Sequence, residues 1–212
     1  MQLFSKMIAV LTMLGCSISV GARCAFAQHQ SLQLELIRKL QSEKTTDQAR
    51  KQLLQFSKSD PSIRKYLITQ LPPMIERGPD SCPPSDIADI SARWHSCPWY
   101  NAVELAGNLK IAEAARTLAP WIAMNSYGGL VLGLSSEYRL DPYPAATALW
   151  QIGNPAIPSV QHVLASGPRR DRDLAIHVLC IVDTPEAKAV LRNFRSRESD
   201  QDLRMTIERC TT

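Results

Sequence analysis

Residues 145–157 read AATALWQIGNPAI and residues 175–187 read AIHVLCIVDTPEA, so a similar stretch returns thirty residues later. Small or apolar residues fall on one another, and proline falls on proline. The matched pairs are Ala145 with Ala175, Ala148 with Val178, Leu149 with Leu179, Ile152 with Val182, and Pro155 with Pro185. A repeat of this length is typical of stacked units, because a short helix pair cannot bury its apolar face alone and shares a core with its neighbours.

Two further copies flank this pair. Upstream, five residues fall on the first stretch at an offset of forty-three, namely Ala102, Leu105, Ala106, Leu109 and Ala114. Downstream, Leu203 and Ile207 match Leu174 and Val178 at an offset of twenty-nine. A loop insertion over residues 125–140 accounts for the thirteen extra residues of the larger offset.

Within each copy the apolar residues recur every three or four positions, which is the spacing of one helix face. The pattern predicts helices over residues 31–42, 46–57, 61–71, 98–108, 111–123, 143–153, 156–166, 170–182, 185–196 and 199–209. Three of these helices begin beside a side-chain oxygen that can cap the first turn, at Asp60, Thr184 and Asp200. We therefore predict an all-α fold, an α-solenoid of stacked antiparallel helix pairs with loop insertions. Only residues 129–134 read as a strand.

A family resemblance supports this architecture. Residues 101–114 and 148–158 resemble HEAT repeats, in particular the short bacterial HEAT-like repeats of the phycobilisome-lyase type. The resemblance covers residues 98–209 well and 46–77 loosely. It implies a right-handed solenoid, and a protein-binding scaffold more often than a catalyst. The aspartate and arginine ladder between such repeats is present in part, as Asp171, Arg172 and Asp183.

The N-terminal segment has the pattern of a secretory signal peptide. Lys6 precedes the apolar run 7–14, and Ala25-Phe26-Ala27 ends in the small residues that a signal peptidase cleaves after. The apolar run is too short to span a bilayer, so we expect cleavage after Ala27 and no stable membrane span afterwards. The alternative is a lipoprotein acylated at Cys16. We expect a periplasmic or secreted protein.

The composition limits the classes of protein to which the chain can belong. The 212 residues are 45% hydrophobic and 21% charged, which suits a buried core and excludes a disordered tail or a polytopic membrane protein. Without residues 1–27, basic residues fall from 24 to 22 against 20 acidic ones, too even a balance for nucleic-acid binding. The expected organisation is a signal peptide at 1–27, N-terminal helices at 28–77, a proline-rich insertion at 78–97, and HEAT-like repeats at 98–212.

Four cysteines remain once the signal peptide is removed. In an exported protein they favour two disulfides, and the spacing favours Cys82 with Cys97 and Cys180 with Cys210. The second pair lies one repeat apart, and facing helices of stacked repeats bring α-carbons within disulfide range. Two alternatives stay open. Cys180 can be a small buried apolar residue, or Cys82 and Cys97 can bind zinc together with His95 and either Asp80 or Asp86.

Motifs for the common catalytic sites are absent. No nucleophile elbow, Walker loop, zinc-protease helix or dinucleotide-binding glycine motif occurs, so we expect no catalytic residue, no cofactor and no metal. A catalytic pair could still form from distant positions, for example Glu104 or Glu113 with His162.

The candidate partner-binding residues are Tyr127, Tyr138 and Tyr143, in the insertion after the 111–123 helix. Long loops inside repeats are often functional, and tyrosine combines apolar area with a hydroxyl. The alternative is that leucines of this loop cover a gap in the core. A second aromatic cluster, made of Trp94, His95, Trp99 and Tyr100, surrounds Cys97, where we expect it to pack rather than bind a ligand.

The sequence therefore predicts an exported, non-enzymatic scaffold that binds a protein or peptide partner. Two other functions remain open, a catalytic scaffold of lyase or isomerase type and a purely structural envelope protein.

Overall fold

The computed structural model describes residues 31–82, 94–126, 140 and 142–212. The expected signal peptide, the alternative lipid site at Cys16, the strand at 129–134, and Tyr127 and Tyr138 lie outside the described residues. The chain divides into two units, Met1–Arg38 and Lys39–Thr212. Residues 31–38 of the first unit are helical. The account below concerns the second unit.

The described residues form helices joined by turns and short loops, without a strand among them, which confirms the all-α prediction. The elements are α2 (Thr46–Ser59), α3 (Pro61–Glu76), η1 (Pro79–Ser81), α5 (Pro98–Asn108), η2 (Ala112–Ala114), α6 (Ala115–Leu118), η3 (Ala119–Trp121), α7 (Pro144–Ile152), η4 (Asn154–Ala156), α8 (Ile157–Ser166), α9 (Arg169–Val182), α10 (Pro185–Arg195) and α11 (Gln201–Thr211).

Two elements differ from the sequence-based expectation. Helix α3 continues to Glu76 through Pro72 and Pro73, because its last turns bury Met74 and Ile75 against the rest of the unit. The helix expected over 111–123 is instead η2, α6 and η3 in succession. Pro120 lies in η3 and has no N–H to continue an α-helical hydrogen-bond pattern.

The expected capping residues hold the starts of three helices. The Asp60 carboxylate accepts from the N–H of Ser62 at 2.8 Å, and the Thr184 hydroxyl accepts from the N–H of Ala187 at 3.3 Å. Asp200 accepts from the N–H of Leu203 at 3.2 Å. Each bond satisfies a first-turn donor that has no partner within its own helix.

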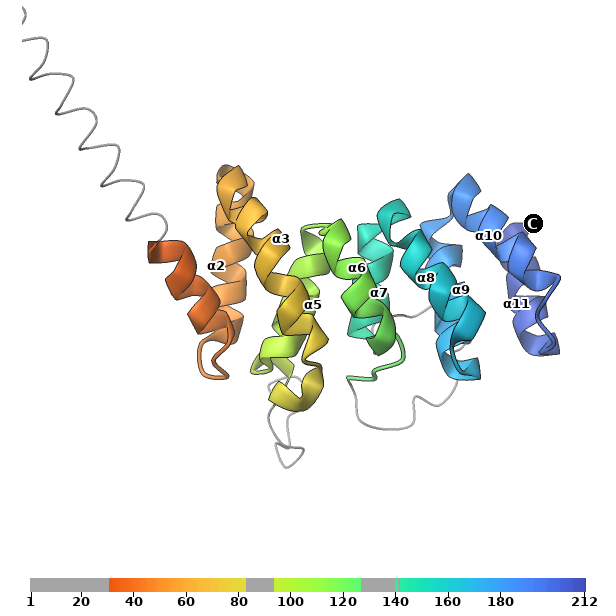
Figure 1. Cartoon of the computed structure of the whole chain (residues 1–212), viewed down its shortest axis with the longest axis horizontal. Helices are drawn as coiled ribbons and strands as arrows, with labels where there is room; N and C mark the ends of the chain where they lie inside the picture. Colours follow the sequence, from red (N-terminus) through yellow and green to blue (C-terminus); the bar gives the residue numbers. More distant parts are fainter. Residues whose placement is uncertain (1–30, 83–93, 127–139, 141) are drawn as a thin grey trace, which may run out of the picture. The chain divides into compact units, whose positions relative to one another are not determined.

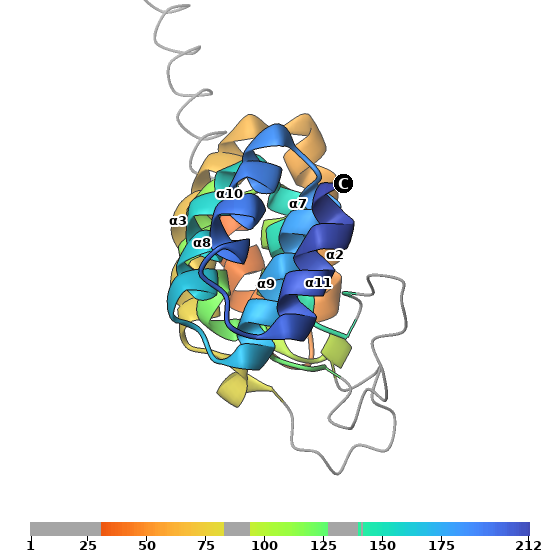
Figure 2. The same ribbon diagram turned by 90° about the vertical axis from the view of Figure 1, so that its right-hand side faces the viewer.

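The helices of the second unit lie in two rows (Figure 1). In one row α2 contacts α5, α5 contacts α7, α7 contacts α9, and α9 contacts α11. In the other row α3 contacts α6, η3 contacts α8, and α8 contacts α10. Figure 2 shows α3, α8 and α10 on one side and α7, α9 and α11 on the other. Apolar residues of both rows meet in between, so helices one repeat apart in sequence are neighbours in space.

Small residues allow α5 and α7 to pack closely. Gly107 lies against α7, where a Cβ atom on it would be 2.8 Å from the Cα of Ala148. Ala102, Ala106 and Ala145 are also completely buried. The alanine pattern of the repeat therefore determines how near the two backbones can approach.

Both expected disulfides are present. Cys82 is bonded to Cys97 with their α-carbons 4.4 Å apart, and Cys180 to Cys210 with theirs 5.3 Å apart. The first disulfide joins the end of η1 to the residue before α5, and the second joins α9 to the last turn of α11. The zinc interpretation fails because the two sulfur atoms it needs are bonded to each other. Cys180 is not the isolated buried thiol of the other alternative.

Candidate functional site

A cleft of about 540 Å³ opens where α5, α7 and α9 end, and we call it the Trp150 cleft. Its lining combines an exposed indole ring, side-chain amides, one amine and aliphatic carbons, from Asn108, Lys110, Trp150, Gln151, Asn154 and Ile181. Helix α7 buries Leu149 and Ile152 on its inner face. Trp150 is next to Leu149 in sequence, points off that face and is 40% exposed.

The three helices beside the cleft end at equivalent positions of the repeat. Each is followed by a residue with left-handed backbone, Lys110 with φ 50°, Gly153 with φ 77° and Asp183 with φ 51°. After α5, the N–H of Lys110 bonds to the carbonyl of Gly107 and the N–H of Ile111 to that of Ala106, each at 2.9 Å. This pair of bonds is a Schellman motif. The repeat therefore brings three helix C-termini to one edge, where carbonyl groups lack partners within the helices.

The chemistry of the Trp150 cleft suits a polypeptide segment. The indole offers apolar area, and each amide of Asn108, Gln151 and Asn154 presents a donor and an acceptor, as a peptide backbone does. The helix C-termini add partial negative charge, which favours N–H donors in a ligand. Periodicity alone did not single out Trp150. Its place one position after a core leucine was the available signal, since that position lies beside the buried stripe of the helix.

A second hollow, of about 660 Å³, contains His162 together with Arg116, Ser159 and Asp171. Burial raises the pKa of the Asp171 carboxyl, while the neighbouring charge of Arg170 opposes that rise. Within the described part of the chain, no hydrogen bond or ion pair joins His162 to Asp171. The structure also does not join His162 to Glu104, whose carboxylate lies 3.1 Å from the Arg50 guanidinium at the α2–α5 contact.

The aromatic residues around Cys97 pack against one another and against neighbouring helices. Trp94 and Trp99 are buried with ring centroids 6.5 Å apart, and Tyr100 lies 5.8 Å from Trp94. The indole N–H of Trp99 donates to the carbonyl of Ile75 at 3.1 Å. The rings thus join the end of α3 to the start of α5 beside the Cys82–Cys97 disulfide.

Tyr143 is the one candidate tyrosine that the structure describes. It is 5% exposed, it precedes the first residue of α7, and the Arg170 guanidinium carbon lies 5.7 Å from its ring centroid. Tyr143 therefore presents little surface to a partner and holds the start of α7. Binding by the loop tyrosines stays a prediction.

Polar side chains meet between α2 and α5, a feature that sequence reasoning missed. Thr46 and Asn101 are completely buried, and the Asn101 amide donates to the carbonyls of His95 and Cys97, each at 2.9 Å. Arg50 lies between Asp47 at 2.9 Å and Glu104 at 3.1 Å. Spacings of three and four place these residues on facing helix sides, which is the signal that could have found them.

The three residues that the resemblance to HEAT repeats singled out, Asp171, Arg172 and Asp183, have different roles in the structure. Arg172, in the first turn of α9, donates to the two carboxylate oxygens of Glu198 at 2.9 and 3.3 Å and to the carbonyl of Gly167 at 3.1 Å. Asp183 pairs with Lys188 at 2.8 Å, and Asp171 lines the His162 hollow. Arg172 thus joins the α8–α9 connection to the α10–α11 connection.

A scan against family models, a search of curated proteins and a search of solved structures each found no match to this chain. Among the described helices none is long and apolar enough to cross a bilayer. The described residues also contain no group of three side chains able to hold a metal ion.

Proposed function

We propose that this chain is an exported, non-enzymatic scaffold of HEAT-like repeats that binds a polypeptide segment of a partner protein in the Trp150 cleft. The observation that carries the proposal is the exposed indole of Trp150, which lies among three amide side chains where three helices of one row end. Tryptophan is enriched among residues that dominate binding energy, since it buries a large area with few rotatable bonds.

The architecture we propose is an α-solenoid in which each antiparallel pair stacks on the next. It is supported by the two rows of contacts and by left-handed residues at equivalent helix ends. A solenoid shares its core only between neighbouring repeats, so its exposed edges run continuously along the chain. Such edges suit an extended segment better than a small molecule.

We also propose that the protein works in the periplasm or outside the cell. Two disulfides support this compartment, because disulfides persist where thiols are kept oxidised. N-terminal sequencing of the exported protein tests the expected signal. Sequence beginning at Gln28 supports it, whereas an acylated Cys16 at the N-terminus contradicts it.

The test of binding uses a peptide library displayed on phage and selected against the purified, disulfide-bonded protein. Selected peptides are then measured with Trp150→Ala and with Leu34→Ala, which removes another exposed apolar side chain. We expect Trp150→Ala to weaken binding on the order of tenfold or more, and Leu34→Ala to leave it unchanged. Equal affinity for Trp150→Ala and the unchanged protein would refute the cleft as the binding site.

A further inference from the structure

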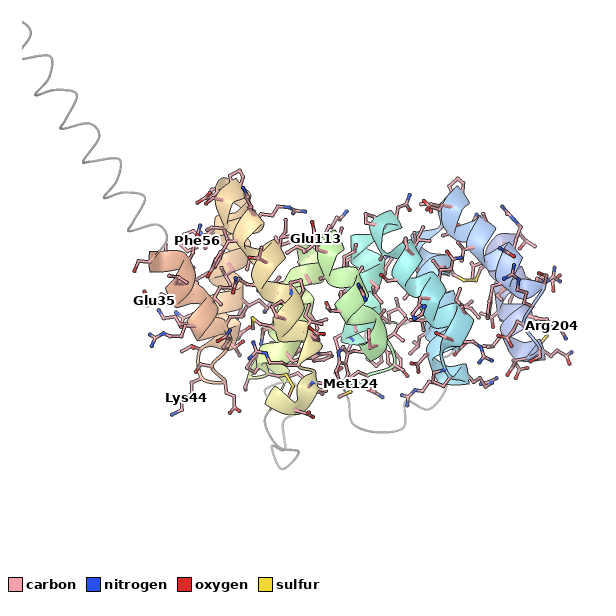
Figure 3. All side chains as sticks on the ribbon, in the orientation of Figure 1. Glu35, Lys44, Phe56, Glu113, Met124 and Arg204 are labelled. Atoms are coloured by element: carbon pink, nitrogen blue, oxygen red, sulfur yellow. A yellow bond between two sulfur atoms is a disulfide. The ribbon has the colours of Figure 1, made fainter. Side chains whose placement is uncertain are left out.

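The last two helices enclose a hollow rich in arginine. It has a volume of about 480 Å³ and lies between α10 and α11; we call it the arginine hollow. Three guanidinium groups line it, those of Arg192 and Arg195 from α10 and of Arg204 from α11. Figure 3 shows Arg204 on α11, at the C-terminal end of the two rows.

One of these three charges is neutralised within the chain. Arg195 pairs with Glu208 at 2.9 Å. Among the residues that the structure describes, neither Arg192 nor Arg204 forms an ion pair or a side-chain hydrogen bond. Two guanidinium groups therefore face one hollow with one carboxylate, which already belongs to Arg195.

Two arginines in the first turn of α9 are matched with acids. Arg169 bonds to Asp200 at 2.6 Å and lies 3.1 Å from Asp202, and Arg172 bonds to Glu198. Acidic residues are therefore available in the connection between α10 and α11, yet they pair with α9 instead of the hollow. The hollow therefore keeps a net positive charge that the acids of this connection do not neutralise.

The outer faces of α10 and α11 are exposed, and polar residues are expected on an exposed helix face. Solubility alone accounts for polar residues there. It does not account for like charges that line one hollow, since these repel each other when no anion lies between them. An exposed apolar residue also lines the hollow, Met205 at 45% exposure, and methionine adapts its shape to a partner surface.

We infer that the arginine hollow binds an acidic segment of a partner polypeptide, with carboxylates on Arg192 and Arg204 and an aliphatic side chain on Met205. The choice of a polypeptide rests on the proposed scaffold function. Guanidinium groups bind carboxylates through two parallel N–H donors, and Ser196 and Gln201, which also line the hollow, have further hydrogen-bonding groups. A nucleic acid would need a basic surface much broader than two free arginines.

The test is fluorescence anisotropy with two labelled peptides, one of alternating glutamate and leucine and one in which glutamine replaces each glutamate. The protein is the full, disulfide-bonded chain. We expect the glutamate peptide to bind at low salt and the glutamine peptide to bind at least tenfold more weakly. Arg192→Ala with Arg204→Ala should abolish the difference, and Arg192→Lys with Arg204→Lys should recover part of it because the charge remains without the fork.

Lys58→Ala with Lys65→Ala is the matched control, since it removes two exposed charges from α2 and α3. Circular dichroism checks that every variant is folded. The inference is wrong if this control loses as much affinity as the arginine double variant, or if single-stranded DNA of equal charge binds more tightly than the glutamate peptide. One outcome would refute this inference alone. In it, Trp150→Ala weakens the binding of phage-selected peptides, but Arg192→Ala with Arg204→Ala leaves the affinity for the glutamate peptide unchanged. The opposite outcome would refute the Trp150 cleft alone. In it, the arginine double variant loses affinity for the glutamate peptide, but Trp150→Ala leaves the affinity of every peptide unchanged.

Discussion

The ion pair between Arg172 and Glu198 makes a sharp prediction about stability. Replacement of Arg172 by methionine keeps the aliphatic part of the side chain and removes the guanidinium group. The Glu198 side chain is 3% exposed and then loses both hydrogen bonds from the guanidinium group, keeping backbone partners that include the N–H of Asp200 at 2.9 Å. A carboxylate stripped of its partner in such a site strongly destabilises the folded state.

The magnitude follows from burial and geometry. Hydrogen bonds to charged groups contribute about 1.5–3 kcal/mol each, and breaking a fully buried pair costs about 3–5 kcal/mol. Arg172 is 24% exposed and its second bond, at 3.3 Å, is long, so the smaller values apply. We expect Arg172→Met to lower the free energy of unfolding by about 2–3 kcal/mol, or the melting temperature by about 4–12 °C for a chain of this size.

Arg169→Met is the matched control. Arg169 also lies in the first turn of α9 and pairs with the connection between α10 and α11, but its side chain is 57% exposed. Exposed pairs contribute far less than buried ones, so this variant should lose less than half as much stability as Arg172→Met. Urea unfolding followed by circular dichroism measures both. Equal losses in the two variants, or a loss below about 1 kcal/mol for Arg172→Met, would show that burial of Glu198 is not what makes the pair important.

The same pair predicts a dependence on pH. Burial raises the pKa of Glu198, but the N–H of Asp200 and the Arg172 guanidinium lower it more, so the net pKa is below its ordinary value of 4.5. A carboxyl whose pKa is lowered in the folded state stabilises the fold above its ordinary pKa, and that contribution is lost as the pH falls through the lowered value. In Arg172→Met the guanidinium group no longer lowers the pKa of Glu198, so that pKa should be higher than in the unchanged protein. The stability gap between the two proteins should therefore narrow below about pH 4.5, and a gap that widens there contradicts the assignment.

Three further variants test how the helices pack and end. Cys180→Ala with Cys210→Ala removes a disulfide that spans thirty residues and should lower the free energy of unfolding in urea by about 3–4 kcal/mol. The amide protons of α11 should then exchange faster. Unchanged exchange there would contradict the view that this disulfide stabilises α11. Lys110 has a left-handed backbone, which costs a residue with a side chain about 1 kcal/mol, and glycine removes that cost. Lys110→Gly should therefore raise the urea midpoint. A lower midpoint would mean that contacts of the lysine side chain stabilise the fold by more than this strain. Gly107→Ala forces a Cβ toward the backbone of Ala148 and should lower the free energy of unfolding by about 1–3 kcal/mol, although alanine favours helices more than glycine does. An unchanged melting temperature in calorimetry would contradict this expectation.

Local features of this chain were predictable because their causes are local. Asp60, Thr184 and Asp200 begin helices since each side chain reaches donors only two or three residues away. The end of the α-helical pattern before Pro120 also has a local cause, because proline lacks the N–H that an α-helix needs. The apolar periodicity of residues 111–123 continues across this proline and therefore predicted one uninterrupted helix. The passage of α3 through Pro72 and Pro73 was not predictable in this way, because burial of the helix end outweighs the lost hydrogen bonds.

The candidate sites were harder to predict. Arg172 could be singled out by its resemblance to a ladder residue, but its partner Glu198 lies 26 residues away in another connection. Tyr143 has the composition of a binding residue and is nevertheless buried beneath Arg170. Composition identifies which residues can bind, whereas exposure depends on what packs above them.

By itself the sequence indicated most of the helices, their repeat of thirty residues and the favoured pairing of the cysteines. All three depend on spacing along the chain, and a repeat converts that spacing into neighbours in space. Only the tertiary structure decided that Trp150 stays exposed at the edge of one row and that Arg192 and Arg204 line one hollow whose single acid, Glu208, pairs with Arg195. The physical reason is that exposure and charge balance are properties of a surface, which exists only once distant helices have packed.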